Sequence, residues 1–270
     1  MPTRIAILGA AGRMGKMVVA EAAKTDGVSV AAAIENAASP AIGRDAGEIA
    51  GLGRAIGVAI ASPSANVDAD VFVDFSFHTA VPGNLAMAAA SNAKGYVLAT
   101  TGLDAAENAS VAAAAAKMPL VRAANMSLGV NLLLGLVRRA AAMLDESYDI
   151  EIVEMHHRHK KDAPSGTAFA LAEAAADGRG KALGDLASYG RRGLSDAERP
   201  FGEIGIHALR GGEVVGDHTV IFAGEHERIE LVHKAQSRAA FAKGALAAAK
   251  WLPGKAPGIY SMLDVLGLNS

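Results

Sequence analysis

The feature that most constrains the fold is an alternation of short apolar runs with alanine-rich helical stretches, which extends from residue 4 to about residue 120. Crossover helices that cover a parallel sheet produce this alternation. Helices are expected to begin near Gly12, Pro82 and Asp104. Strands are expected at 5–8, 28–34, 71–75 and 96–99, with a last one near 120–123. The first half is therefore predicted to be a doubly wound α/β domain.

The pattern changes after Asn125. A helix is expected at 131–144 and a strand at 148–157. Three more apolar runs, at 204–209, 214–223 and 228–233, are separated by turn sequences typical of consecutive antiparallel strands. A second, α+β domain with a mostly antiparallel sheet is therefore predicted. A further helix is expected at 239–251, and the apolar ending after it should dock on the fold.

One segment of the second half fits no regular element. Residues 177–202 are rich in Gly, Arg and Asp and form too long a stretch for an ordinary connection. This length predicts a mobile or functional segment.

Composition excludes several classes of function. The 26 basic and 28 acidic side chains give a net charge of −2, and only 4% of residues are aromatic, so nucleic acid is not an expected partner. Cysteine is absent, which rules out disulfides, thiolate zinc sites and a cysteine nucleophile. The most apolar window, 123–137, is too short for a bilayer and contains polar residues. We expect a soluble, cytoplasmic protein with no signal peptide and no membrane partner.

A glycine-rich heptapeptide, Gly-Ala-Ala-Gly-Arg-Met-Gly at 9–15, follows a predicted strand and opens a predicted helix. In doubly wound, Rossmann-like sheets, such a turn binds a pyrophosphate at the helix N-terminus. Glu35 lies at the end of the second strand, where a carboxylate can accept hydrogen bonds from ribose hydroxyls. Ala11 and Met14 replace two of the usual glycines, so a tight turn with no ligand remains an alternative. Arg13 could reach a phosphate or be solvated.

A second cluster contains three of the eight histidines, at 156, 157 and 159. Pro164 and the sequence Ser-Gly-Thr at 165–167 then begin an alanine-rich helix, whose free amides and hydroxyls can hold a carboxylate beside Lys160. Histidine and lysine can supply protons near neutral pH. The remaining histidines are interpreted as structural or surface residues: His78, His207, His218, His226 and His233.

Three alternatives to this proton-transfer site are open. A metal site at His156, His157 and His159 would require adjacent side chains on opposite faces of a strand to converge. A hydrolase based on Ser165 lacks the Gly-x-Ser-x-Gly elbow. The third alternative is a solvated basic turn.

Four motifs together resemble those of the 4-hydroxy-tetrahydrodipicolinate reductase family, also called dihydrodipicolinate reductases. They are the heptapeptide at 9–15, Ala-Thr-Thr-Gly at 99–102, Ala-Ala-Asn-Met-Ser at 123–127, and His-His-Arg-His-Lys-Lys-Asp-Ala-Pro-Ser-Gly-Thr-Ala at 156–168. The resemblance covers essentially the whole chain, and the histidine-rich motif is its most specific part. It implies a dinucleotide-binding domain at 1–127 and 237–270, a substrate-binding and oligomerisation domain at 128–236, and a homotetramer assembled through the substrate-domain sheets.

The resemblance also implies a reaction. NADPH or NADH reduces 4-hydroxy-2,3,4,5-tetrahydrodipicolinate, with loss of water, to tetrahydrodipicolinate, a step toward diaminopimelate and lysine. No metal is required, and the substrate partner is a small dicarboxylate. A nucleotide-binding sensor without catalysis, or another small-substrate NAD(P)-dependent dehydrogenase, stays open as an alternative.

The resemblance assigns roles to individual residues. His156 is the expected proton donor or acceptor and Lys160 a proton donor, while the substrate is held by His157, Ser165, Gly166 and Thr167. The residues expected at the adenosine and pyrophosphate are Gly9, Ala10, Ala11, Gly12, Arg13, Met14, Glu35 and Asn36. Those expected on the nicotinamide side are Ala99, Thr100, Thr101, Ala123, Ala124, Asn125 and Met126.

Three positions depart from the family pattern. Ala99 stands where glycine is common, Met126 where phenylalanine is common, and Asn36 where some members have an arginine for the 2′-phosphate. Because Asn36 offers no charge to a 2′-phosphate, we expect both cofactors to be used with no large preference for NADPH.

Overall fold

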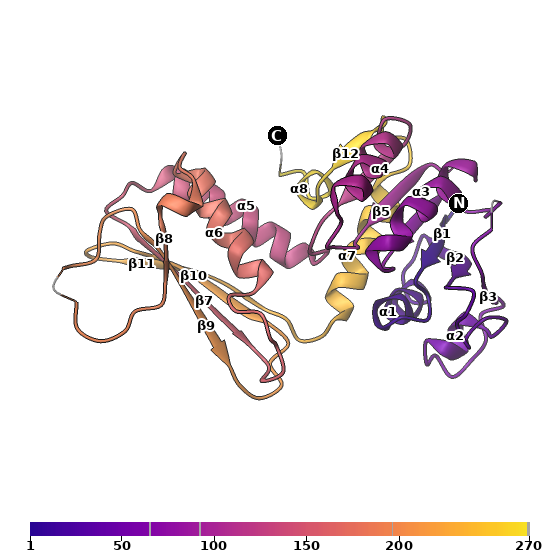
Figure 1. Ribbon diagram of the computed structural model, residues 1–270, viewed down its shortest axis with the longest axis horizontal. Coiled ribbons are helices and arrows are strands. Elements are labelled where there is room, and N and C mark those ends of the chain that lie inside the picture. Colours follow the sequence, from indigo (N-terminus) through magenta and orange to yellow (C-terminus); the bar gives the residue numbers. More distant parts are fainter. Residues whose placement is uncertain (65, 92, 196, 269–270) are drawn as a thin grey trace. The chain divides into compact units, whose positions relative to one another are not determined.

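The computed structural model describes residues 1–64, 66–91, 93–195 and 197–268 (Figure 1). The chain divides into two compact units. Unit 1 contains Met1–Leu128 and Arg238–Ser270, and unit 2 contains Gly129–Ser237. Along the described ranges, no helix combines the length and apolar character that crossing a membrane requires.

Unit 1 is built on a seven-stranded sheet with the order β12-β6-β5-β4-β1-β2-β3. Every pairing in it is parallel, which confirms the predicted doubly wound sheet. The strands are β1 (Thr3–Leu8), β2 (Val28–Ile34), β3 (Ile60–Ala61), β4 (Val71–Asp74), β5 (Gly95–Leu98), β6 (Pro119–Arg122) and β12 (Gly258–Tyr260). The chain runs from β1 to the β3 edge and returns to place β4 on the other side of β1. This reversal is where ligands bind in such sheets.

Helices cover both faces of this sheet. The core on one face contains side chains of α1 (Arg13–Ala22), α7 (Ala239–Trp251) and α8 (Met262–Val265). The core on the other contains side chains of α3 (Val81–Ala90) and α4 (Ala105–Ala115). Two shorter helices are α2 (Ala46–Ile49) and the 3-10 helix η1 (His78–Ala80). Because α7 is the late helix that the sequence predicts, the end of the chain completes unit 1.

Unit 2 contains a five-stranded sheet with the order β11-β10-β7-β9-β8. Its strands are β7 (Asp149–His156), β8 (Ala187–Tyr189), β9 (Ile204–Arg210), β10 (Asp217–Ala223) and β11 (Arg228–Lys234). Helices α5 (Leu128–Met143) and α6 (Gly166–Gly178) contribute to the core on one face, and the 3-10 helix η2 spans Leu183–Asp185. A second unit that mixes helices with its own sheet is thereby confirmed.

The pairing within this second sheet corrects the prediction. Strands β9 and β10 were expected to be antiparallel neighbours, but β7 lies between them, parallel to β9 and antiparallel to β10. With β8 parallel to β9 and β10 antiparallel to β11, the sheet is mixed and not mostly antiparallel. The reason is the helical crossover through α6, which returns the chain parallel to β7.

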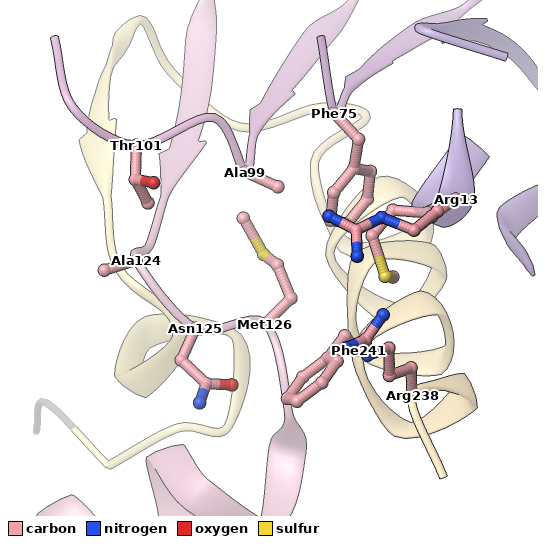
Figure 2. Close-up of a pocket in the computed structure, with 10 residues that line it drawn as sticks. Arg13, Phe75, Ala99, Thr101, Ala124, Asn125, Met126, Arg238 and Phe241 are labelled. Carbon is pink, nitrogen blue, oxygen red and sulfur yellow. The ribbon is translucent and has the colours of Figure 1, made fainter. Parts of the chain in front are cut away.

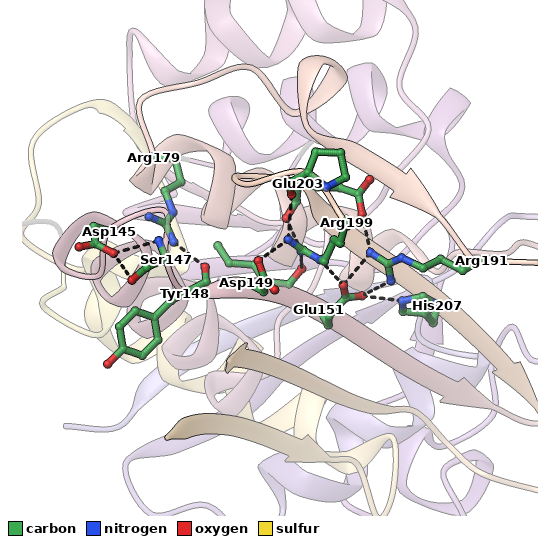
Figure 3. A network of polar contacts seen from close by, with 12 residues as sticks. Asp145, Ser147, Tyr148, Asp149, Glu151, Arg179, Arg191, Arg199, Glu203 and His207 are labelled. Atoms are coloured by element: carbon green, nitrogen blue, oxygen red, sulfur yellow. Dashed lines mark hydrogen bonds and ion pairs between the residues drawn. The ribbon is translucent and has the colours of Figure 1, made fainter. Parts of the chain in front are cut away.

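The long segment at 177–202 contains structure of its own, although residue 196 lies outside the described ranges. It includes η2 and β8, and two of its arginines bind Glu151 on β7 (Figure 3). Burial opposes ionisation of Glu151, but hydrogen bonds from Arg191, His207 and Arg199 outweigh burial and lower its pKa to about 2. These ion pairs attach the segment to the sheet.

Candidate active site

The glycine-rich turn after β1 packs closely against the end of β4. Gly9 has a φ of +74°, and a Cβ there would lie 3.0 Å from the carbonyl oxygen of Phe75. A Cβ on Gly15 would lie 2.1 Å from the carbonyl oxygen of Gly9. These two positions therefore require glycine, and the turn lies at the reversal between β1 and β4.

The N-terminus of α1 has the features of an anion site. Gly12 is its N-cap and provides no side-chain cap, so backbone amides of the first turn can face a ligand. Glu35 lies against the same turn, where its carboxylate accepts hydrogen bonds from the amides of Ala11 and Asn36, each at 2.9 Å. The turn and the acidic residue thus come together as expected for a dinucleotide.

A pocket of roughly 330 Å³ opens beside this turn (Figure 2). In that view Met126 lies between a wall with Thr101, Ala124 and Asn125 and a wall with two arginines and two aromatic rings. Seven of the residues expected to bind the cofactor line it: Arg13, Met14, Ala99, Thr101, Ala124, Asn125 and Met126. Three lining residues were missed: Phe75, Arg238 and Phe241. The last two come from the start of α7, far along the chain.

The other expected cofactor residues lie around the pocket and do not line it. Gly9, Ala10, Ala11 and Gly12 form the turn, and Glu35 and Asn36 follow β2. The Ala123 amide donates to the carbonyl of Leu98, and the Thr100 hydroxyl is buried against Asp74.

In unit 2, Glu154 organises the histidine-rich motif. This fully buried carboxylate accepts hydrogen bonds from His156 Nδ1 at 2.5 Å, from Arg210 at 2.8 Å and from the Ser165 amide at 3.1 Å. Burial opposes its ionisation, but the contacts with Arg210 and His156 prevail and lower the pKa of Glu154. Because Nδ1 of His156 donates to Glu154, Nε2 is left as the nitrogen that can exchange a proton with a ligand.

Ser165 begins helix α6 as its N-cap. Its Oγ accepts from the amide of Ala168 at 3.2 Å and lies 3.1 Å from Nε2 of His218. The His218 ring is buried, 5.2 Å from the His156 ring, and burial together with His156 lowers its pKa to about 4. The sequence indicates only a structural or surface role for His218. Its contact with Ser165 makes it part of the cluster, and no motif in the sequence signalled it.

The remaining motif residues lie in the loop after β7 and in the first turn of α6. Lys160 binds the carboxylate of Asp162 at 2.8 Å and thereby lowers the pKa of that carboxyl group. His157 is partly buried, and its amide donates to Val214. Gly166 and Thr167 are the first residues of α6. Backbone amides at a helix N-terminus favour binding of a carboxylate.

The structure does not bring the three histidines of the metal hypothesis together. His156 binds Glu154, whereas the exposed His159 lies 3.6 Å from Glu213. Within the described part of the chain, no group of three His, Cys, Asp or Glu side chains is arranged to hold a metal ion.

The two units therefore carry complementary chemistry. Unit 1 has a doubly wound sheet, a helix N-terminus with no side-chain cap and a pocket with two arginines. Unit 2 has a histidine and a lysine beside a second helix N-terminus. Together these features define a dinucleotide-dependent oxidoreductase that acts on a small anionic substrate.

The comparisons with known proteins agree with this class. A family model described as "Dihydrodipicolinate reductase, N-terminus" matches residues 3–126, and one described as "Dihydrodipicolinate reductase, C-terminus" matches residues 129–266. The chain belongs to the dihydrodipicolinate reductase family. The resemblance inferred from the motifs is confirmed, and with it an NADH- or NADPH-dependent oxidoreductase.

Curated relatives cover nearly the whole chain. The 4-hydroxy-tetrahydrodipicolinate reductase of Anaeromyxobacter dehalogenans is 51% identical over 269 residues, which is 99% of this chain and 98% of that protein. That of Parvibaculum lavamentivorans is 51% identical over 268 residues, 98% of each. A dipicolinate-bound dihydrodipicolinate reductase from Paenisporosarcina has the same fold, with a TM-score of 0.76 and 23% identity over 98% of this chain and 99% of that one.

Proposed function

We propose that the pocket beside the glycine-rich turn holds the dinucleotide and that the cluster around Glu154 and Ser165 binds and protonates the substrate. The reaction is the reduction of 4-hydroxy-2,3,4,5-tetrahydrodipicolinate to tetrahydrodipicolinate, with loss of water, in the biosynthesis of diaminopimelate and lysine, and we place it in the cytoplasm. The observation that carries this proposal is the hydrogen bond between His156 and the buried Glu154, beside the N-terminus of α6.

The residues of unit 1 fit the dinucleotide. The uncapped N-terminus of α1 and the arginines at 13 and 238 would bind the pyrophosphate, and Glu35 would accept from the ribose hydroxyls. Met126, Ala99 and Thr101 would contact the nicotinamide, which supplies the hydride when bound. We assign the dinucleotide to residues 1–127 and 237–270, of which 269–270 lie outside the described residues.

The residues of unit 2, within 128–236, fit a dicarboxylate. Amides of Gly166 and Thr167 at the start of α6 and the ammonium group of Lys160 supply donors to carboxylates. Overall, the substrate gains one hydride and one proton and releases one water. His156 Nε2 exchanges the proton while Glu154 stabilises the imidazolium form, and Lys160 is the second donor.

The first test is turnover of two variants. His156→Ala and Lys160→Ala should each lower kcat/KM by about 10²-fold or more, because positioned proton transfer contributes that much. Lys161→Ala, which removes the adjacent exposed lysine, is the matched control and should keep the wild-type rate. Cofactor absorbance with freshly generated substrate reports the rates. Wild-type rates for both variants would remove these residues from the mechanism.

Cofactor preference is tested at Asn36. Its exposed side chain accepts a hydrogen bond from the Ala38 amide and carries no charge. We expect the ratio of kcat/KM for NADPH over NADH to stay below about 10², equivalent to some 2.7 kcal/mol. Asn36→Arg should raise this ratio because arginine can bind a 2′-phosphate. A wild-type ratio above that value would contradict the expectation.

We also assign to unit 2 a role in assembly as a homotetramer. Alternate β7 side chains, including Val153 and Met155, point to the sheet face opposite the core formed with α5 and α6. On the neighbouring strands Leu209 pairs with Met155, and Val232 faces Thr219. Leu209 and Val232 are each 49% exposed. Exposed apolar side chains on a sheet face, such as these, support pairing with a second copy.

A further inference from the structure

Asp74, the last residue of β4, is a fully buried carboxylate with four neutral hydrogen-bond donors. Its Oδ1 accepts from the Ser76 amide at 2.8 Å and from the Thr100 hydroxyl at 3.1 Å. Its Oδ2 accepts from the Tyr96 hydroxyl at 2.5 Å and from the Asn84 amide group at 3.1 Å. Burying a carboxylate costs free energy unless hydrogen-bond donors replace the water that it loses. The fold must therefore hold all four donors in place around Asp74.

The protonation of Tyr96 is fixed by the same environment. Burial and the charge of Asp74 raise the pKa of the Tyr96 hydroxyl well above its usual value. Near neutral pH the phenol therefore stays protonated and can donate to Asp74.

Two of the four donors, the Ser76 amide and the Thr100 hydroxyl, come from segments that contribute lining residues to the proposed cofactor pocket. Ser76 follows Phe75, and Thr100 lies between Ala99 and Thr101; those three neighbours line the pocket. The backbone adds a link, because the Ala99 amide donates to the Asp74 carbonyl at 3.0 Å. Thr100 is buried, and its hydroxyl also lies 3.2 Å from the Ser76 carbonyl oxygen. Asp74 therefore joins both segments at the carboxyl ends of β4 and β5.

We propose that Asp74 is a positioning residue for the dinucleotide. Its carboxylate holds the segments at 75–76 and 99–101 in the conformation that shapes the nicotinamide side of the pocket. Thr100 acts through this carboxylate and does not contact the cofactor with its hydroxyl. The inference rests on the proposed assignment of the pocket to the cofactor.

Two substitutions separate positioning from general stability. Thr100→Val and Tyr96→Phe each remove one hydroxyl donor from the same carboxylate and nearly preserve side-chain shape. Only Thr100 belongs to a pocket segment, whereas Tyr96 is fully buried within β5. Since Tyr96 makes the shorter bond, Tyr96→Phe is expected to destabilise the fold at least as much as Thr100→Val.

The measurement is binding of NADH, followed by its fluorescence, to the full-length chain, together with the denaturant midpoint of each variant. Thr100→Val should weaken NADH binding about tenfold, which corresponds to about 1.4 kcal/mol, and Tyr96→Phe should change it by less than about twofold. Thr100→Ser, which restores the hydroxyl, should return the affinity to within about twofold of wild type. Asp74→Asn is a harsher variant that could fail to fold, and the hydroxyl variants keep the test independent of it.

Two results would overturn the inference. One is equal weakening by Thr100→Val and Tyr96→Phe, since a general loss of stability would then explain both. The other is unchanged affinity in Thr100→Val. Arg13→Ala separates this failure from failure of the proposed function, because unchanged NADH affinity in that variant would show that the cofactor does not occupy the pocket.

Discussion

At the residue scale, the neutral, buried His218 makes stability depend on pH. Its folded pKa of about 4 lies below the ordinary value of 6.5, so an unfolded chain takes up this proton first as pH falls. The contribution to stability is complete above pH 6.5 and is lost as pH falls toward 4. Between pH 7 and pH 5 this one group accounts for a loss of about 2 kcal/mol in the free energy of unfolding.

Replacing His218 by glutamine should remove that part of the pH dependence. Urea unfolding at pH 7 and pH 5 would show a smaller difference in His218→Gln than in the wild type. His226→Gln is the control, because His226 is exposed and its loss should leave the difference unchanged. Equal differences in His218→Gln and wild type would refute the prediction.

Residues within contiguous motifs could be located from sequence, because a strand, a turn and a helix start have local signatures. Gly9, Glu35 and Ser165 lie where those signatures indicated. Arg238 and His218 could not be located in this way. Arg238 lines the pocket and His218 contacts Ser165 through tertiary packing, each from an element far along the chain, and neither lies in a recognisable motif.

At the scale of elements, α7 approaches the pocket segment closely at one glycine. A Cβ on Gly244 would lie 1.7 Å from the carbonyl oxygen of Met126. Met126 lines the pocket, so a shift of α7 at this contact would also move a wall of the proposed cofactor site.

Gly244→Ala should therefore destabilise the protein, although helix propensity alone favours alanine by up to about 1 kcal/mol. Overpacking should cost about 1–3 kcal/mol, and KM for the cofactor should rise. Gly83→Ala in α3 is the matched control, because a Cβ there meets nothing within 4 Å and should stabilise the helix. Thermal unfolding and steady-state kinetics measure both effects. Stabilisation by Gly244→Ala would contradict the close approach of α7 to Met126.

The order of strands in unit 2 was harder to predict than their positions. Alternating burial along β7 and β10 marks each as a strand, but the pattern does not say which neighbours it has. The turn sequences before and after β10 look alike. Strands β10 and β11 nevertheless form a hairpin, whereas β9 and β10 do not. Pairing depends on the crossover through α6, which is a property of the whole unit.

At the scale of the whole molecule, the proposed tetramer depends on the open sheet face of unit 2. Leu209→Glu and Val232→Lys place charges on that face and should yield smaller species in analytical ultracentrifugation. Met143→Lys, at the exposed end of α5, is the control and should leave the mass unchanged. A wild-type protein that sediments as a monomer would reject the assembly.

The interruption of unit 1 by unit 2 has a consequence for synthesis on the ribosome. Residues 1–128 emerge first, but one face of their sheet is covered by α7, and the β6 edge is paired by β12, near the end of the chain. Unit 2 is contiguous and is complete before α7 emerges. Domains fold as units during translation. Unit 2, although later in the sequence, can therefore reach its native state first. The apolar sheet face of unit 1 stays uncovered until α7 and β12 have emerged, so it is exposed longest to chaperones and to aggregation.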